Sequence, residues 1–301
     1  MTTPTTPFVS VIIPVYNDID RLKICLEQLE KQTYPAERYE IIVVDNASDN
    51  PVEPAMQPFP HVRVVHEANP GPDIARNAGL AVASGEILAF TDSDCIPYVD
   101  WLEKGAANLQ QHPDCGLVGG RVDVFPQDPE KLTWVELYES VFAFRTKINI
   151  AKYHFMQTCN LFTFKSVFDA VGEFDDSLNT PGDEEWGQRV HAHGFPLIYV
   201  DDVAIRHPAR RTFKALHKKT KRITFRYIGL LGERYNRPPW LQYKFYKRLF
   251  IFPMPSEWRA VFNSNLSFLQ KLKVLFVLFW TRCIRAFEMV HALLSQRNRL
   301  W

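Results

Sequence analysis

The chain has 301 residues, and its hydrophobic content of 46% is typical of a globular protein and excludes wholesale disorder. Its 13 glycines and 21 prolines form no repeat, which excludes a collagen-like chain. The formal net charge of +1 hides two opposite parts. Residues 1–202 carry 14 basic and 31 acidic side chains (net −17), and residues 203–301 carry 21 basic and 3 acidic ones (net +18). This asymmetry predicts an anionic partner for the C-terminal third, either a membrane surface or a nucleic acid.

The five cysteines are odd in number, widely separated and never arranged as Cys-x-x-Cys. This spacing argues against a disulfide framework and a zinc site, and it fits a reducing compartment. Residues 1–7 are expected to be a disordered leader, and no signal peptide is evident. No stretch reaches the roughly 18 apolar residues of a spanning helix, because Arg282 and Arg285 follow the longest late run, Val274 to Trp280. We therefore expect a cytoplasmic protein without a transmembrane segment.

In chain order, the first 200 residues alternate between strand and helix patterns. The β-rich run Phe8–Val15 comes first, and a helix over 20–32 follows it with leucines at helical spacing. Later strands are predicted at Glu40–Val44, His61–His66, Glu86–Phe90, Gly116–Phe125, Thr158–Phe164 and Leu197–Val200. Helices are predicted between them at Asp73–Ala83, Trp101–Gln111, Lys131–Arg145, near Val167 and at Asp183–His193. The alternation predicts an α/β fold with a Rossmann-like, mixed but mostly parallel sheet flanked by helices.

The basic C-terminal part has a helical pattern throughout. Phe213–Leu231 is predicted to be a helix, and Asn265–Gln296 is predicted to be one long helix or two shorter ones. The centre of the second segment, Leu272–Trp280, is apolar nearly all round apart from Lys273. A helix that is apolar on every side is normally buried, so we expect this centre to lie in a core.

The sharpest chemical signal is Asp92-Ser93-Asp94, directly after the predicted strand Glu86–Phe90. Ligands of parallel sheets bind beyond the carboxyl ends of the strands, so both carboxylates would project into that crevice. Two carboxylates around a small residue can share Mg²⁺ or Mn²⁺, which takes oxygen ligands and bridges the phosphates of a nucleotide. Acidic loops are also common at strand ends without any ligand, and the triplet alone leaves both interpretations open.

Two further residues have a functional and a purely structural interpretation. Asp45 also stands at a predicted strand end, where its carboxylate could accept a hydrogen bond from a nucleobase or form an Asx turn. Arg76 lies on the predicted helix Asp73–Ala83, where it could bind a base or phosphate or remain a surface arginine. In isolation, the structural interpretation is favoured for both.

The last signals lie near the end of the predicted sheet. Asp183, Glu184 and Glu185 open a predicted helix, where acids are favourable for structural reasons, but one of them could be a general base. His207 follows the last predicted strand, and we expect the chain to turn there. A neutral imidazole at this point could complete a metal shell, although a lone histidine is more often a surface residue.

Together these pieces resemble the family 2 glycosyltransferases, which have the GT-A fold. The resemblance runs from about Phe8 to about Tyr227 and rests on six motifs in the family's order: VSVIIPVYN (9–17), VVDNAS (43–48), ARNAG (75–79), DSD (92–94), GEFD (172–175) and GDEEW (182–186). It implies a GT-A domain over 8–228 and a basic, aromatic, helical C-terminal region over 229–301. The resemblance implies an inverting enzyme. The family's processive synthases have a Gln-x-x-Arg-Trp motif and membrane spans, and because neither is found here we expect an enzyme of single addition.

The resemblance also implies roles for individual residues. The nucleotide-sugar donor would be bound by Pro14, Val15, Tyr16, Asp45, Arg76, Asp92, Ser93 and Asn160. The metal, Mn²⁺ or Mg²⁺, would be held by Asp94, Asp92 and His207. Asp183 matches the general base, although glycine precedes it where the family often has an acid. The acceptor side would include Glu184, Trp186, Gly120 and Arg121, and the donor would be a UDP-, GDP- or dTDP-sugar.

Competing functions remain at this point. A nucleotidyltransferase can share this fold, but the Gly-rich basic loop it usually needs after the first strand is missing. A nucleic-acid binder would use the basic third and leave the acidic motifs idle, so we expect no nucleic acid partner. The basic third fits a solvated face, a peripheral site on an anionic membrane, or a homo-oligomer contact through the C-terminal helix. We expect cell-surface or exopolysaccharide glycan synthesis, with a glycan or lipid-linked acceptor at the inner membrane face.

Overall fold

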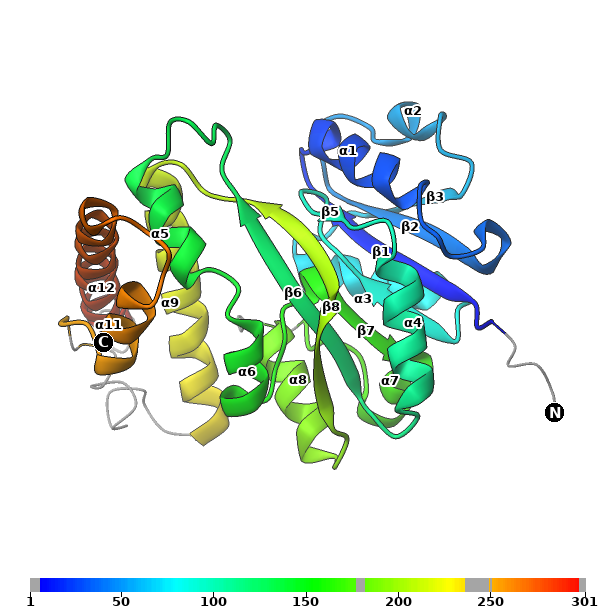
Figure 1. Ribbon diagram of the computed structural model, residues 1–301. Coiled ribbons are helices and arrows are strands. Elements are labelled where there is room, and N and C mark those ends of the chain that lie inside the picture. The colour runs from blue at the N-terminus through cyan, green and yellow to red at the C-terminus, as the bar shows by residue number, and fades with distance from the viewer. Residues whose placement is uncertain (1–5, 177–181, 236–248, 250, 298–301) are drawn as a thin grey trace. The chain divides into compact units, whose positions relative to one another are not determined.

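The structure is a computed structural model that describes residues 6–176, 182–235, 249 and 251–297 (Figure 1). The chain divides into two compact units. The first unit comprises residues 1–123, 144–176 and 182–207, and the second comprises 124–143, 177–181 and 208–301. The sheet and the predicted site residues belong to the first unit, and most of the basic C-terminal part belongs to the second.

The sheet has eight strands in the order β3-β2-β1-β4-β7-β6-β8-β5. The strands β1 (Val9–Val15), β2 (Tyr39–Asn46), β3 (Val62–Glu67) and β4 (Ile87–Phe90) are parallel, with β1 between β2 and β4. The antiparallel pairs β4·β7, β6·β7 and β5·β8 involve the later strands, which are β5 (Ile96–Pro97), β6 (Leu117–Phe125), β7 (Leu161–Phe164) and β8 (Leu197–Pro208). The expected α/β fold with a mixed sheet is confirmed.

The alternating side chains of β1 explain why the sheet has a core on each face. Val9, Val11 and Ile13 belong to one buried cluster, and Ile12 belongs to another. The first cluster also contains residues of α1 (Ile19–Leu29) and α4 (Trp101–Gln111). The second contains residues of α3 (Pro72–Val82), α7 (Lys165–Val171) and α8 (Gly182–Ala192). Both faces of β1 are therefore buried, which fits its mostly apolar sequence. Its one polar side chain, Ser10, is buried as well and donates a hydrogen bond to Glu40 (2.6 Å).

Some boundaries differ from the prediction. The helix predicted over 131–145 is shorter in the structure, α5 (Trp134–Phe142), and ends before Phe144, which adopts a left-handed φ of 47°. The helix that follows, α6 (Thr146–Tyr153), was not predicted. The last strand, β8, continues through His207, so the turn expected there is wrong. The short elements α2 (Glu53–Met56), β5, η1 (Ala36–Arg38) and η2 (Thr158–Asn160) were not predicted separately. In the leader, residues 1–5 lie outside the described residues, and the buried Pro7 accepts a hydrogen bond from Tyr34 Oη (2.6 Å).

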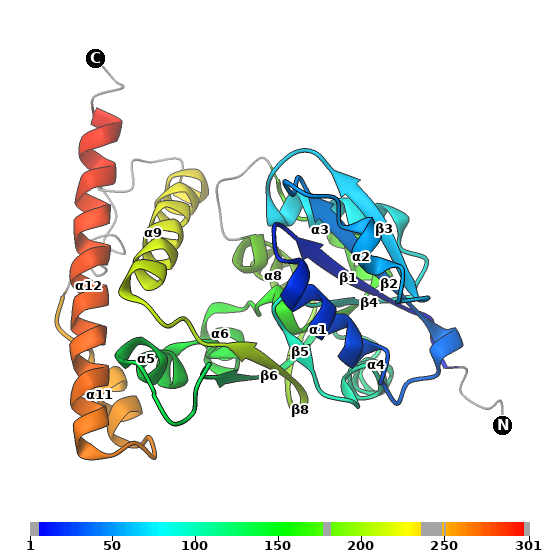
Figure 2. The same ribbon diagram turned by 90° about the horizontal axis from the view of Figure 1, so that it is seen from above.

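The second unit is helical. It contains α5, α9 (Phe213–Tyr235), α11 (Pro255–Phe262) and α12 (Phe268–Arg297), and Figure 2 shows α12 beside α9 and α5. The buried Glu139 of α5 accepts hydrogen bonds from Arg210 and Lys219. Burial alone would raise the pKa of Glu139, but these cations outweigh it and lower the pKa. Through these buried ion pairs, Glu139 connects α5 to α9 and to the segment that precedes α9.

The prediction that the centre of α12 is buried is confirmed for one face of the helix and wrong for the other. Val274, Val277 and Leu278 are buried, but Leu272 is 47% exposed, Phe276 52% and Phe279 40%. A helix centre that is apolar all round thus contributes one face to the core and leaves the other uncovered. Within the described residues, no helix combines the length and apolar composition that crossing a membrane requires.

The packing of α4 on the sheet gives a test of the fold. A Cβ atom at Gly105 would overlap the ring of Phe162 on β7. We expect Gly105→Ala to lower the free energy of unfolding by about 2 kcal/mol, because overpacking outweighs the gain in helix propensity. Denaturant unfolding measures this effect, with Gln110→Ala on the exposed side of α4 as the control, which should change little. An unchanged stability of Gly105→Ala would contradict the close approach of α4 to β7.

Candidate active site

The predicted site lies at the carboxyl ends of three parallel strands. In the register of the sheet, Val15 on β1 is opposite Asp45 on β2, and Ile12 on β1 is opposite Phe90 on β4. The loop with Asp92 directly follows Phe90, so it leaves the sheet at the same edge as Asp45. Strand topology alone therefore brings together residues that are 47 positions apart in the sequence.

The acidic loop is surrounded by cationic and titratable groups. Asp94 Oδ1 lies 3.5 Å from His207 Nε2, and Asp94 Oδ2 lies 3.4 Å from Arg21 Nη1. Burial raises the pKa of Asp94, His207 opposes this shift and the neighbouring Asp92 adds to it. Burial and Asp92 both disfavour the charged form of Asp94, and a divalent cation at this position would favour it.

Arg76 is the centre of the charged network. Its side chain on α3 is only 8% exposed, and it donates to Asp73 Oδ1 (2.9 Å) and to Asp92 Oδ1 (3.0 Å). Asp183 in the first turn of α8 also acts on Arg76 electrostatically. One buried guanidinium therefore holds a residue of the acidic loop and lies beside the predicted base.

The predicted base Asp183 has a raised pKa. Burial, opposed by Arg76, raises the pKa of Asp183 to about 6. Its Oδ1 accepts a hydrogen bond from the backbone N–H of Glu184 (2.9 Å), and the preceding Gly182 lies against the carboxylate of Asp73. A carboxylate with a pKa near 6 is a better proton acceptor than an ordinary aspartate and is still ionised at pH 7.

The residues predicted to contact the nucleobase lie at the ends of β1 and β2. Asp45 is buried, and its Oδ1 accepts a hydrogen bond from the backbone N–H of Ser48 (3.2 Å), while Oδ2 lies 3.4 Å from His66 Nδ1. The Asp45 carboxylate therefore binds the backbone three residues further on, one residue beyond an Asx turn, and its contact with a nucleobase stays a prediction. At the end of β1, Val15 is buried and Tyr16 is 60% exposed.

Several predicted residues have structural roles in this conformation. The side chain of Asn160 donates to the carbonyls of Arg121 and Val203 and accepts from Trp101 Nε1. Trp186 is fully buried against Phe168. We therefore leave the side chains of Asn160 and Trp186 out of the proposed site.

The acceptor-side residues on β6 are likewise engaged in structure. A Cβ atom at Gly120 would overlap the carbonyl of Val203, so glycine is needed there for close packing. Arg121 forms ion pairs with Asp123 and Asp201 (2.9 and 2.8 Å). Glu184 on α8 is partly exposed and is hydrogen-bonded only weakly, by Gln188 Nε2 at 3.4 Å.

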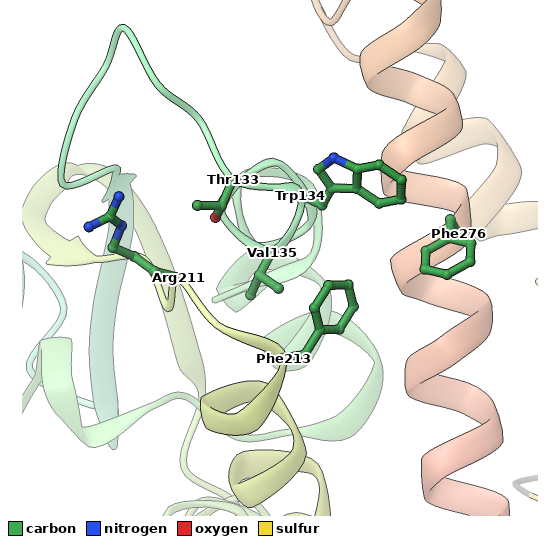
Figure 3. A pocket seen from close by; sticks show the side chains of 6 residues that line it. All are labelled: Thr133, Trp134, Val135, Arg211, Phe213 and Phe276. Carbon is green, nitrogen blue, oxygen red and sulfur yellow. The ribbon is translucent and has the colours of Figure 1, made fainter.

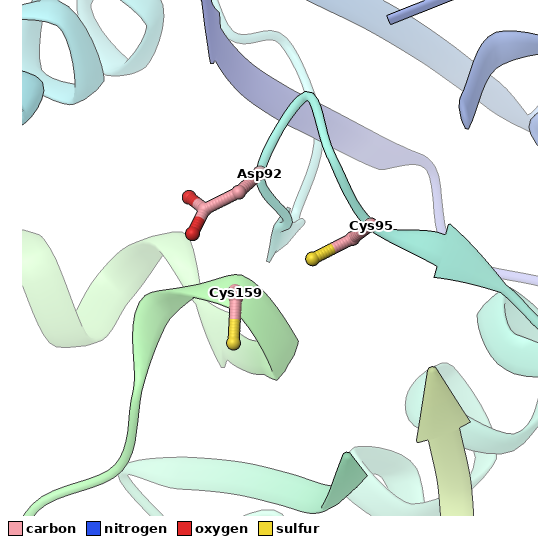
Figure 4. Close-up of side chains that lie close together, drawn as sticks. All are labelled: Asp92, Cys95 and Cys159. Atoms are coloured by element: carbon pink, nitrogen blue, oxygen red, sulfur yellow. The ribbon is translucent and has the colours of Figure 1, made fainter. Parts of the chain in front are cut away.

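The sequence interpretation missed four residues around the acidic loop. Asp73, interpreted as a helix-capping acid, and Arg21 of α1 both hold site residues. Cys95 and Cys159 lie near Asp92, as Figure 4 shows, with Cys95 on the same loop and Cys159 on η2. Direct adjacency in the chain (Cys95 after Asp94, Cys159 before Asn160) was the available signal, but spacing rules for metal sites look for paired cysteines.

Comparison with known proteins gives the chain a family. The model of glycosyl transferase family 2 matches residues 10–172, more than half of the chain. Glycosyltransferase AglE of Haloferax volcanii is 38% identical over 226 residues, which is 73% of each chain. The uncharacterised glycosyltransferase YibD of Escherichia coli strain K12 is 46% identical over 94 residues, but this match spans only 27% of that relative and 30% of this chain.

Solved structures show the same fold. The mannosyltransferase PcManGT of Pyrobaculum calidifontis, in complex with GDP-Man and Mn²⁺, superposes with a TM-score of 0.60 at 19% identity, covering 99% of this chain and 81% of that one. TarS (residues 1–349) of S. aureus superposes with a TM-score of 0.51 at 16% identity over 91% and 71% of the two chains. These likenesses confirm the expected GT-A fold. With the family model and the relative at 38% identity, they show that the chain is a glycosyltransferase and belongs to glycosyl transferase family 2.

Proposed function

We propose that the protein transfers a sugar from a nucleoside-diphosphate donor to an acceptor hydroxyl, with inversion at the anomeric carbon and with a divalent cation. The observation that supports this proposal most is the position of the Arg76 guanidinium, which binds Asp92 at the acidic loop and interacts electrostatically with Asp183. A donor-binding group and a proton acceptor are thereby held at one edge of the sheet. Thermal-shift measurements with UDP-, GDP- and dTDP-sugars, each with and without Mn²⁺, test this: the proposal requires metal-dependent stabilisation by one of them.

The residues of the acidic loop fit a Mn²⁺ or Mg²⁺ ion. Asp94 offers a carboxylate whose pKa burial raises, and His207 offers an imidazole nitrogen 3.5 Å away. Asp92 would be the third ligand, although its Oδ1 is bonded to Arg76. Oxygen ligands suit both ions, and a histidine nitrogen is more readily accepted by Mn²⁺. When bound, the cation supplies charge neutralisation for the leaving diphosphate.

Asp183 is the proposed general base. The acceptor hydroxyl loses its proton to the Asp183 carboxylate, its oxygen bonds to the anomeric carbon, and the bond from that carbon to the diphosphate oxygen breaks. Attack on the face opposite the leaving group inverts the configuration and needs no covalent enzyme intermediate. The pKa of about 6 keeps Asp183 ionised at neutral pH while making it basic enough to accept the proton.

The nucleotide would lie between the ends of β1 and β2. Asp45 is placed to accept N–H groups of a base through a carboxylate that Ser48 already orients, and the exposed ring of Tyr16 stands at the neighbouring strand end. The structure of PcManGT is a complex with GDP-Man, which makes GDP-sugars the first donors to test. A base with adjacent N–H groups, such as guanine, suits a carboxylate acceptor.

We further propose that the second unit binds an anionic membrane surface, where a lipid-linked acceptor for cell-surface or exopolysaccharide synthesis would be found. One side of α12 exposes a row of apolar residues three or four positions apart, with one gap of eight positions after Phe279: Leu269, Leu272, Phe276, Phe279, Phe287, Val290 and Leu294. The row is about 38 Å long, from 25 residues at 1.5 Å each. Residues 208–301 carry 20 basic and 3 acidic side chains, which complements anionic lipid.

A pocket on the same unit continues this surface inward. Its lining comes from the start of α5, the segment before α9 and α12, as Figure 3 shows: Thr133, Trp134, Val135, Arg211, Phe213 and Phe276. Phe276, from the exposed row, packs edge-on against Trp134 (ring centroids 5.4 Å apart). An apolar pocket with one arginine at the edge of an apolar row fits a lipid chain with an anionic head group.

The base assignment gives the first prediction. Asp183→Asn removes the proton acceptor and should lower kcat by about 10²–10⁴-fold or more, while the thermal shift caused by donor and Mn²⁺ persists. The neighbouring Glu184→Gln is the matched control and should keep its activity. Loss of activity in Glu184→Gln with retention in Asp183→Asn would show that the wrong acid has been chosen.

The pH dependence gives the second prediction. Because the pKa of Asp183 is raised to about 6, transfer should increase as the pH rises through about 6 and become flat above it. Arg76 lowers the pKa of Asp183, so Arg76→Gln should move this limb to higher pH, by about one unit, at saturating donor. The exposed Arg63→Gln should leave the profile in place. An unmoved profile in active Arg76→Gln would contradict electrostatic coupling between the two residues.

The membrane surface gives the third prediction. The double variant Phe276→Ser, Phe279→Ser should float with anionic vesicles far less than the wild type, because two of the three exposed phenyl rings of the row are lost. Ile148→Ser, at a 40% exposed residue of the first unit, is the control. Neutral vesicles should bind the wild type weakly. Equal flotation of the double variant and the wild type would contradict membrane binding by this row. If the wild type were a dimer without lipid and the double variant a monomer, the row would be a contact between two copies of the chain.

A further inference from the structure

A second set of metal-binding atoms overlaps the acidic loop. A carboxylate oxygen of Asp94, the sulfur of Cys95 and a ring nitrogen of His207 all lie within 4.8 Å of one another. Cys95 is fully buried, His207 is 5% exposed and the side chain of Asp94 is 24% exposed. The three atoms come from a loop and from the end of β8, so the fold and not a local sequence motif brings them together.

The chemistry of these three atoms differs from that of an oxygen site. One carboxylate, one thiolate and one imidazole are each ordinary ligands of Zn²⁺, and three protein ligands with one open position are typical of catalytic zinc sites. Mg²⁺ and Mn²⁺ prefer oxygen, whereas a thiolate favours zinc and other soft ions. We infer that Asp94, Cys95 and His207 form a binding site for a thiophilic divalent cation such as Zn²⁺, in which the Cys95 thiolate is a direct ligand.

A neighbouring group of atoms is the weaker choice. Asp92, Cys95 and Cys159 also lie within 4.8 Å of one another, as Figure 4 shows for the three side chains. However, Asp92 Oδ1 already accepts from the Arg76 guanidinium at 3.0 Å, which leaves only its second oxygen for a cation, as in the proposed Mn²⁺ or Mg²⁺ site. Cys159 shares a hydrogen bond with Cys95, so its role here is to orient the Cys95 sulfur. Cys159 is therefore a positioning residue in this inference.

The proton balance is simple. Without a metal Cys95 is a thiol, as an ordinary cysteine is at neutral pH. Binding of the cation forms the metal–sulfur bond and releases one proton to solvent. The thiolate and the Asp94 carboxylate then balance the two charges of the ion, and the imidazole stays neutral. A neutral cluster is what a largely buried site of this kind tolerates.

This inference rests on the proposed function only in that the two sites share Asp94 and His207. Because of the shared residues, Zn²⁺ and Mn²⁺ cannot bind at the same time, and the Cys95 thiolate gives the site its preference for Zn²⁺. Zinc binding by these residues does not require sugar transfer, so the two proposals can fail separately.

The test is a titration of the metal-free full chain with Co²⁺, which reports thiolate ligation by a charge-transfer band in the near ultraviolet. The wild type should develop this band with one equivalent of Co²⁺ and lose it when Zn²⁺ is added. Cys95→Ser should lack the band and bind Zn²⁺ at least about tenfold more weakly, with Mn²⁺ binding unchanged. Cys115→Ser, at a second buried thiol of the first unit, and Cys159→Ser should both keep the band.

The opposite outcomes overturn the inference. These are a wild type without the band, a band that persists in Cys95→Ser, or a band that is lost in Cys159→Ser and kept in His207→Gln. Because a buried variant can fail to fold, ¹¹³Cd NMR of the wild type gives an independent measurement, and a shift typical of oxygen ligands alone also overturns it. A normal cobalt band without Mn²⁺-dependent donor binding would instead count against the proposed transfer function only.

Discussion

The site depends on one buried cation, the guanidinium of Arg76. Asp73, Asp92 and Asp183 come from three different elements, and without a positive charge among them their carboxylates would repel each other in a partly desolvated region. With Arg76 in place, α3 is joined to the loop after β4, and the Asp183 carboxylate keeps a pKa near 6. The same interaction therefore stabilises the edge of the sheet and sets the basicity of the proposed base.

Much of this arrangement could be predicted from the sequence because its causes are local. The apolar run of β1 and the turn after it fixed the strand and its end, and parallel strands place Asp45 and Asp92 at one edge. The partners of these residues are set by tertiary packing and could not be predicted. Asp73 looks like a helix cap in the sequence, yet its carboxylate binds Arg76 and lies against Gly182.

For the residues whose roles the family resemblance implied, the sequence likewise indicates the position but not the partners. Asn160 lies beside the site, but its side-chain amide is hydrogen-bonded to Trp101 and to two backbone carbonyls. The apolar centre of α12 shows the converse limit, because the number of faces that a helix buries depends on its neighbours and not on its own residues. Cys95 and Cys159 are 64 positions apart, and only the fold makes them a pair.

On the proposed function, the near-neutral total charge combines two ways of binding anions. The acids of the first unit would bind a diphosphate only through a cation between their carboxylates and the phosphates, and metal identity would then be a point of control. The bases of the second unit would attract phosphate head groups without any bridging ion, and the apolar row of α12 would add burial that free phosphate in solution cannot provide. The donor would therefore be bound with strict metal dependence, whereas association with an acceptor-bearing membrane would depend on salt and on lipid charge.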